Sequence, residues 1–190
     1  MKQALFDKIN YDKAYRKNRL RAAQWVLQNP ENFEELLHYC FVEDKQLAKK
    51  ATWVLEFVCR ENLLLLYPHL CYFFENLHRA QGDGALRAVA LIFELLAIAH
   101  YKKNDAKLKP RFTQKHKETM TENCFDWLIT PQKVACQARA MTALYFLGTE
   151  MAWVHPELKT IIETNLHKGS AGYQNRGAKT IEKILKYNKY

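Results

Sequence analysis

Few residues of this chain have the types and spacing that chemistry requires. The closest grouping of metal-ligand types is His69, Cys71 and His78. Residues two apart on a helix point to different sides, so we do not expect His69 and Cys71 to share one ion. The chain has no glycine-rich phosphate loop, no Gly-x-Ser-x-Gly and no His-Glu-x-x-His, which are the usual signatures of nucleotide, serine-hydrolase and zinc sites. The sequence therefore predicts no metal and no cofactor, and it favours a non-catalytic protein.

Asp126 and Trp127, in "CFDWLIT", are the remaining catalytic candidates. The pair lies near the end of an expected helix, in an acidic part of the chain. The favoured interpretation is a solvated Asp126 beside a Trp127 that packs between helices, with a catalytic Asp126 as the alternative.

The net charge of +9 is concentrated in three segments. Residues 1–21, 102–117 and 168–190 carry +5, +6 and +5, whereas the stretches between them are mildly acidic. Such clusters could bind the phosphates of a nucleic acid, provided that they fold onto one face. The candidates for contact with nucleic acid or another partner are Lys102, Lys103, Lys107, Lys109, Arg111, Lys115, Lys117, Arg19, Arg21, Lys179 and Lys183.

The internal basic segment has a simpler interpretation as a connection. Pro110 disfavours a helix at Lys109 and predicts an extended or turn conformation there. Runs of like charge repel one another and are typical of solvated loops. We therefore expect a basic insertion at about residues 102–112.

Helical spacing of apolar residues dominates the rest of the chain. Between residues 47 and 58, apolar side chains recur at the spacing of one buried helical face, and no stretch keeps the alternation of a strand. The sequence predicts an all-α fold. We expect helices over 12–28, 31–41, 44–60, 67–80, 84–101, 112–129, 131–148, 156–168 and 171–187.

The helices repeat. "AAQWVLQ" at 22–28 is echoed by "KATWVLE" at 50–56, and "RAVALIF" at 87–93, "RAMTALY" at 139–145 and "RGAKTIE" at 176–182 continue the theme. A second helix type begins with proline, at Pro30, Pro68 and Pro156, where the missing N–H costs nothing. Trp25 and Trp53 occupy matching places in the first two repeats; packing between repeats is favoured, and a stacking surface is the alternative.

Paired helices of this kind cannot cover their own apolar faces, so they must stack. The pattern, over about residues 18–187, resembles HEAT and armadillo repeats. The resemblance implies a single α-solenoid domain over 1–190, a right-handed α-α superhelix of four to five helix pairs and roughly nine helices. It also implies a binding scaffold whose partner is another protein, with a nucleic-acid-binding module as the alternative.

The plan is similar, too, to that of the DNA alkylation repair glycosylases. Those proteins use a carboxylate framed by aromatic residues in a basic concave groove. The resemblance implies Asp126 as the carboxylate, although the flanking residues of that family are not matched here.

The cysteines and the longest apolar run bear on the compartment. The five cysteines, at 40, 59, 71, 124 and 136, form no disulfide framework, and we expect them to be buried thiols. The N-terminus lacks the apolar stretch of a signal peptide, and the run from Ala88 to Ala99 is shorter than the roughly 18 residues of a membrane span. We expect a cytoplasmic protein with no membrane partner.

Overall fold

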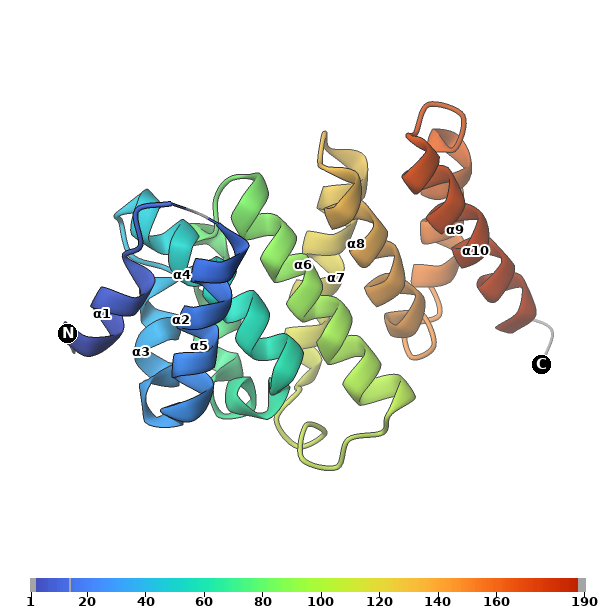
Figure 1. Cartoon of the computed structure of the whole chain (residues 1–190). Helices are drawn as coiled ribbons and strands as arrows, with labels where there is room; N and C mark the ends of the chain where they lie inside the picture. Colours follow the sequence, from blue (N-terminus) through green and yellow to red (C-terminus); the bar gives the residue numbers. More distant parts are fainter. Residues whose placement is uncertain (1–2, 14, 188–190) are drawn as a thin grey trace. The chain divides into compact units, whose positions relative to one another are not determined.

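The computed structural model describes residues 3–13 and 15–187, which form ten α-helices and no strand (Figure 1). The all-α prediction is confirmed. The α-helices are α1 (Gln3–Ile9), α2 (Arg16–Gln28), α3 (Phe33–Tyr39), α4 (Lys45–Glu61), α5 (Leu70–Glu75), α6 (Asp83–Ala97), α7 (Gln114–Ile129), α8 (Val134–Leu147), α9 (Val154–Asn165) and α10 (Ala171–Tyr187). Short 3₁₀ turns are η1 (Pro30–Asn32), η2 (Leu63–His69) and η3 (Leu77–Arg79), and η4 (Ile98–Lys102) is a π-helical extension of α6.

The chain divides into two compact units. Unit 1 comprises residues 1–92 and 106–112, and unit 2 comprises residues 93–105 and 113–190. A single domain and a right-handed superhelix both stay predictions.

In unit 1, α2 packs along α4, and α3 packs against α4. Small and branched residues allow the close approach of α2 and α4, because Ala22 and Ala51 are almost fully buried beside Val26 and Val54. The side chain of Asp44 begins α4, where its Oδ1 accepts hydrogen bonds from the backbone N–H groups of residues 46 and 47 at 2.9 and 3.1 Å.

In unit 2, α8 packs against α7, α9 and α10 and forms the centre of the core. The ring of Trp127 is 5% exposed and stacks on Phe93, with 5.4 Å between centroids. Gly177 lets α10 approach α9, because a Cβ at that position would lie 2.8 Å from Cγ2 of Ile162. The end of α8 is equally tight, since a Cβ on Gly148 would lie 2.1 Å from the ring of His155.

The basic insertion is less solvated than we expected. Residues 103–113 form a loop between η4 and α7, and Lys109 lies in a turn, as Pro110 predicts. Its apolar residues are buried, however: Leu108 is 0% and Phe112 2% exposed, and the Phe112 ring lies 6.2 Å from that of Phe74. The insertion is therefore anchored to unit 1 by these two side chains.

The predicted helix bounds agree with the observed ones to within four residues, except at two places. The helix expected to begin at residue 67 is preceded by η2, so Pro68 lies inside a 3₁₀ turn rather than at a start. Burial of Leu66 and Tyr67 orders the residues before the proline. The helix α1 was not expected; Leu5 and Ile9, one helical turn apart, are both 0% exposed. Pro30 and Pro156 lie in first turns, as predicted.

The segment Asp83–Lys102, which is α6 with η4, is long and apolar enough to cross a membrane by length and composition. More than half of its most apolar window, 56%, is buried within the protein.

Candidate functional site

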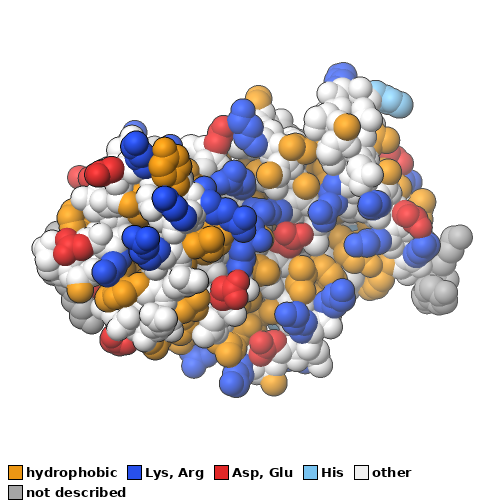
Figure 2. All heavy atoms as spheres, viewed as in Figure 1, with side chains coloured by type: hydrophobic (Ala, Val, Ile, Leu, Met, Phe, Trp, Pro, Cys, Tyr) orange, Lys and Arg blue, Asp and Glu red, His pale blue; other side chains and the backbone are white. Residues whose placement is uncertain are grey.

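Cations and aromatic rings meet on α2 and α4 of unit 1 and, separately, on α8 and α10 of unit 2. Figure 2 shows Lys and Arg side chains gathered over these helices. We call the first set, Arg19, Lys49, Trp53 and Phe57, the α2–α4 face. We call the second set, Thr142, Tyr145, Arg176, Lys179 and Lys183, the α8–α10 face.

On the α2–α4 face, two cations bracket one indole. The Arg19 guanidinium lies 5.0 Å from the Trp53 ring centroid and 5.9 Å from that of Phe57, and the Lys49 ammonium lies 5.0 Å from Trp53. These distances are within the range of cation–π attraction. Gly84 supports the indole from α6, because a Cβ there would lie 2.8 Å from its Nε1. Trp53 therefore positions cations instead of offering a bare ring to a base.

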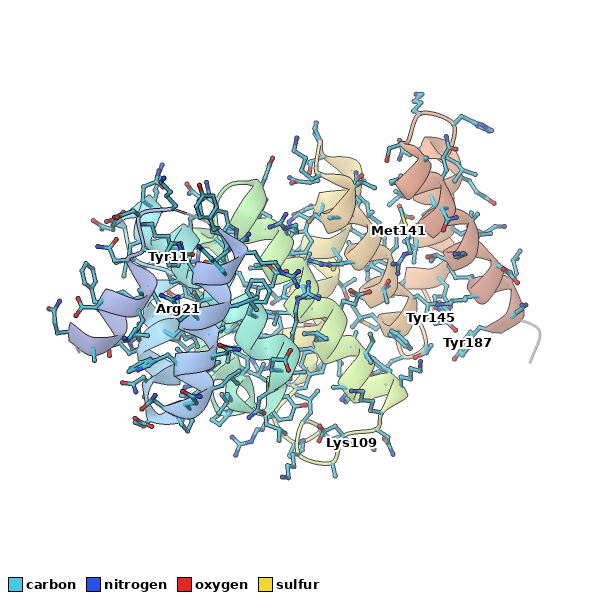
Figure 3. All side chains as sticks on the ribbon, in the orientation of Figure 1. Tyr11, Arg21, Lys109, Met141, Tyr145 and Tyr187 are labelled. Carbon is cyan, nitrogen blue, oxygen red and sulfur yellow. The ribbon has the colours of Figure 1, made fainter. Side chains whose placement is uncertain are left out.

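Two of the predicted site residues on α2 lie in different surroundings. Arg19 is half-buried against Trp53, and its Nε is buried without a hydrogen-bond partner among the described residues. Arg21 is exposed (Figure 3), and a separation of two residues directs it to another side of the helix. Only Arg19 belongs to the α2–α4 face.

On the α8–α10 face, hydrogen bonds and ion pairs fix one arginine. The Arg176 guanidinium donates to Oγ1 of Thr142 at 2.7 Å and lies 3.7 Å from a carboxylate oxygen of Glu94. The other oxygen of Glu94 lies 3.8 Å from Nε of Arg139. The Glu94 carboxylate, 17% exposed, is therefore within ion-pair distance of two guanidinium groups. Lys183 extends over the Tyr145 ring, with its ammonium 5.6 Å from the centroid.

The Tyr145 ring packs against other aromatic side chains of unit 2. It stacks on His155, with centroids 5.6 Å apart, and His155 meets Tyr187 edge-on at 5.1 Å. Figure 3 shows Tyr145 on α8 near Tyr187 at the end of α10. Nε2 of the same imidazole donates a hydrogen bond of 2.8 Å to the backbone carbonyl oxygen of Tyr145. These contacts hold the Tyr145 ring of the α8–α10 face in one orientation.

Sequence reasoning missed most of this face. It proposed Lys179 and Lys183, and the structure places both beside a small cavity of 130 Å³ between α8 and α10. It did not propose Glu94, Arg139 or Arg176. A signal was present, because each of the quoted segments "RAMTALY" and "RGAKTIE" begins with one of these arginines.

The cations of residues 102–117 are not among the residues that define either face. The candidates whose side chains are exposed there are Lys102, Lys103, Lys107, Lys109, Arg111 and Lys115. Lys117 is different: it is 8% exposed, and its ammonium bonds both carboxylate oxygens of Glu150, at 2.8 and 2.7 Å. Tyr101 donates a third hydrogen bond to Glu150 at 2.8 Å. The charge of Lys117 is thus neutralised within unit 2.

The ionisation of this cluster follows from its contacts. Burial alone would raise the pKa of Glu150, but the hydrogen bonds from Lys117 and Tyr101 and the charge of Lys117 outweigh it, so that the pKa is lowered. Burial and the adjacent carboxylate both raise the pKa of Tyr101. At neutral pH the Glu150 carboxyl is therefore ionised and the Tyr101 phenol keeps its proton.

Asp126 is exposed on α7, and Trp127 is buried against Phe93. This is the arrangement of the favoured interpretation. A catalytic role for Asp126 stays a prediction.

Among residues 3–13 and 15–187, no three His, Cys, Asp or Glu side chains are close enough to hold a metal ion. Four thiols are buried, and burial raises the pKa of Cys40 to about 12. The expectation that all five are buried is wrong for Cys71, which is exposed on α5.

Comparison with known families decides the relationship. The model of the HEAT repeat domain matches residues 8–186. The chain belongs to the HEAT repeat domain family. The resemblance to HEAT repeats is therefore confirmed, and this HEAT repeat protein is a helical-repeat scaffold of a kind that commonly mediates interactions. No curated protein and no solved structure matches the chain.

Proposed function

We propose that this HEAT repeat protein is a non-catalytic scaffold that binds nucleic acid through the α2–α4 and α8–α10 faces. The observation that supports this proposal is that several cations on these faces lack an acidic partner within the described part of the chain. Lys49, Lys179 and Lys183 form no ion pair with an acidic side chain among the described residues. Rigid aromatic neighbours hold Arg19, Lys49 and Lys183 in place, so little freedom is lost when they meet a phosphate.

The aromatic rings favour contacts with the backbone over base stacking. Trp53 is occupied by two cations and Tyr145 by one, so the rings are covered by the groups that phosphates attract. Cations that neutralise phosphates release counterions and carry no sequence information. We therefore propose binding with little preference for sequence.

A salt titration tests this function. Labelled single-stranded and duplex oligonucleotides of one length are titrated with the protein, and fluorescence anisotropy is measured at 50 and 200 mM salt. Four phosphate contacts to duplex would weaken binding about 150-fold over this range, at a slope of about −0.9 per phosphate. Undetectable binding at 50 mM salt, or binding that ignores salt, would overturn the proposal.

A protein partner is the second candidate, and a separate surface favours it. In unit 2, Trp153 is 58% exposed and stacks on Phe125 of α7 at 5.6 Å, and Ile129, one turn further along α7, is 63% exposed. Exposed tryptophan and aliphatic side chains in one patch are typical of protein contacts.

Pull-down from the native cell tests this candidate. A partner bound by the wild type and lost with Trp153→Ala, but retained when Lys179 and Lys183 are changed to Gln, would place protein binding on this patch. A partner that Trp153→Ala retains would remove the patch as its site.

A further inference from the structure

We propose that the cavity between α8 and α10 is a binding site for one phosphate group. Its assignment to a phosphate of a nucleic-acid backbone rests on the proposed function, whereas its affinity for phosphate itself does not. The cavity has a volume of 130 Å³ and lies wholly within unit 2. Its lining comes from Thr142 and Tyr145 on α8 and, on α10, from three cations, Arg176, Lys179 and Lys183, together with Asn175 and Thr180.

The spacing of the three cations brings them to one side of α10. Residues three and four apart are neighbours on a helix surface, so Arg176, Lys179 and Lys183 form one row. All three line the same cavity. The acid nearest in sequence, Glu182, is engaged elsewhere on α10, because its carboxylate bonds the Lys186 ammonium at 2.6 Å. The row therefore concentrates positive charge at the cavity.

Arg176 is oriented before any ligand arrives. Thr142 accepts its hydrogen bond at 2.7 Å, and Glu94 lies 3.7 Å from the same nitrogen, Nη1. With Nη1 engaged, Nε and Nη2 keep N–H donors for a second acceptor. A planar guanidinium fork matches two oxygens of a phosphate, which a lysine ammonium cannot reproduce.

The charge balance favours an anion over a neutral ligand. Glu94 is shared with Arg139 at 3.8 Å, so it offsets only part of the charge of the two arginines. Lys179 and Lys183 have no acidic partner among the described residues. A tetrahedral phosphate can accept hydrogen bonds from the fork and from both ammonium groups together, and a carboxylate has fewer acceptor oxygens for them.

Isothermal titration calorimetry of the full chain with inorganic phosphate at pH 7 and 20 mM salt tests the site. We expect saturable binding of one phosphate per chain. Affinity should fall at least tenfold when Lys179 and Lys183 are both changed to Gln, and also with Arg176→Lys, which keeps the charge but removes the fork. The matched control changes Lys103 and Lys168, exposed lysines of unit 2 outside the cavity, to Gln and should keep wild-type affinity. Thermal unfolding confirms that every variant is folded.

Competition separates the sources of the phosphate. If an oligonucleotide displaces inorganic phosphate, the site serves nucleic-acid binding. If phosphate binds and oligonucleotides neither bind nor displace it, the site stands as one for free phosphate and the proposed function fails.

The opposite outcomes overturn the site. Oligonucleotide binding without phosphate binding would leave the proposed function in place and remove the cavity from it. Equal affinity for acetate or an oligoglutamate peptide would contradict selectivity for phosphate, as would equal loss of affinity in the control variant.

Discussion

Replacing Lys117 tests whether its ammonium stabilises the fold through Glu150 or binds a phosphate. Lys117→Met keeps most of the apolar stem and removes the ammonium. The lost contacts are two charge-assisted hydrogen bonds of 2.8 and 2.7 Å and a cation–π contact with Tyr101 at 5.9 Å. Lys115→Met, two residues away, removes an exposed ammonium and is the matched control.

The expected loss of stability is about 1.5 kcal/mol. Hydrogen bonds to charged groups contribute about 1.5–3 kcal/mol. The Glu150 side chain is 39% exposed, so water partly replaces the lost partner and the lower end of that range applies. For a chain of this length, a change of 1.5 kcal/mol lowers Tm by about 3–6 °C. The control should stay within about 0.5 kcal/mol of the wild type.

Urea unfolding followed by circular dichroism at pH 7 measures both variants. Equal midpoints for Lys117→Met, Lys115→Met and the wild type would refute the structural role of the pair. A second result would also refute it: a fall of about 0.9 in the salt slope of nucleic-acid binding with Lys117→Met would mean that this ammonium contacts a phosphate.

Three further outcomes follow from buried and exposed groups. In thermal unfolding, Gly148→Ala should cost about 1–3 kcal/mol, because the new Cβ would overlap the ring of His155. Gly172→Ala should cost less, because its Cβ would lie 3.3 Å from Cγ2 of Val134, an exposed side chain that can shift. Only the Cys71 thiol should react rapidly with Ellman's reagent in the folded protein, and all five should react in urea; rapid reaction of a second thiol would contradict the burial. Folding lowers the pKa of Glu150, so the stability that its ion pair with Lys117 contributes is present above the unfolded pKa of 4.5 and is lost as the pH falls through the folded pKa. The free energy of unfolding should therefore fall less steeply below pH 4.5 in Lys117→Met than in the wild type.

The sequence predicted the helices because apolar residues three and four positions apart lie on one face of a helix, so the pattern is local. The apolar face of residues 47–58 became α4, and the repeated small residues at 22–28 and 50–56 became the packed pair α2 and α4. The missed helix, α1, is seven residues long and has one pair of apolar residues a turn apart, which is too short a pattern to stand out.

The features that the sequence did not predict depend on contacts between residues distant in the chain. Leu108 and Phe112 lie in a loop with no periodicity, and only the tertiary fold shows that they are buried. Lys117 is one of seven cations between residues 102 and 117, and its partner Glu150 is 33 residues away. The Glu94 carboxylate pairs with arginines from two other helices, which no local pattern could indicate.

The central claim is that the cations of the two faces, and not those of the insertion, bind nucleic acid. Two triple variants with the same change in net charge test it most directly. One changes Lys49, Lys179 and Lys183 to Gln, and the other changes Lys103, Lys109 and Lys115.

The measurement is the salt slope of duplex binding for both variants and the wild type. The face variant should lose up to about 2.7 from the slope, at about 0.9 for each phosphate contact, and the insertion variant should keep the slope of the wild type. An equal loss in both variants would mean that net charge alone drives binding, and a loss confined to the insertion variant would contradict the claim.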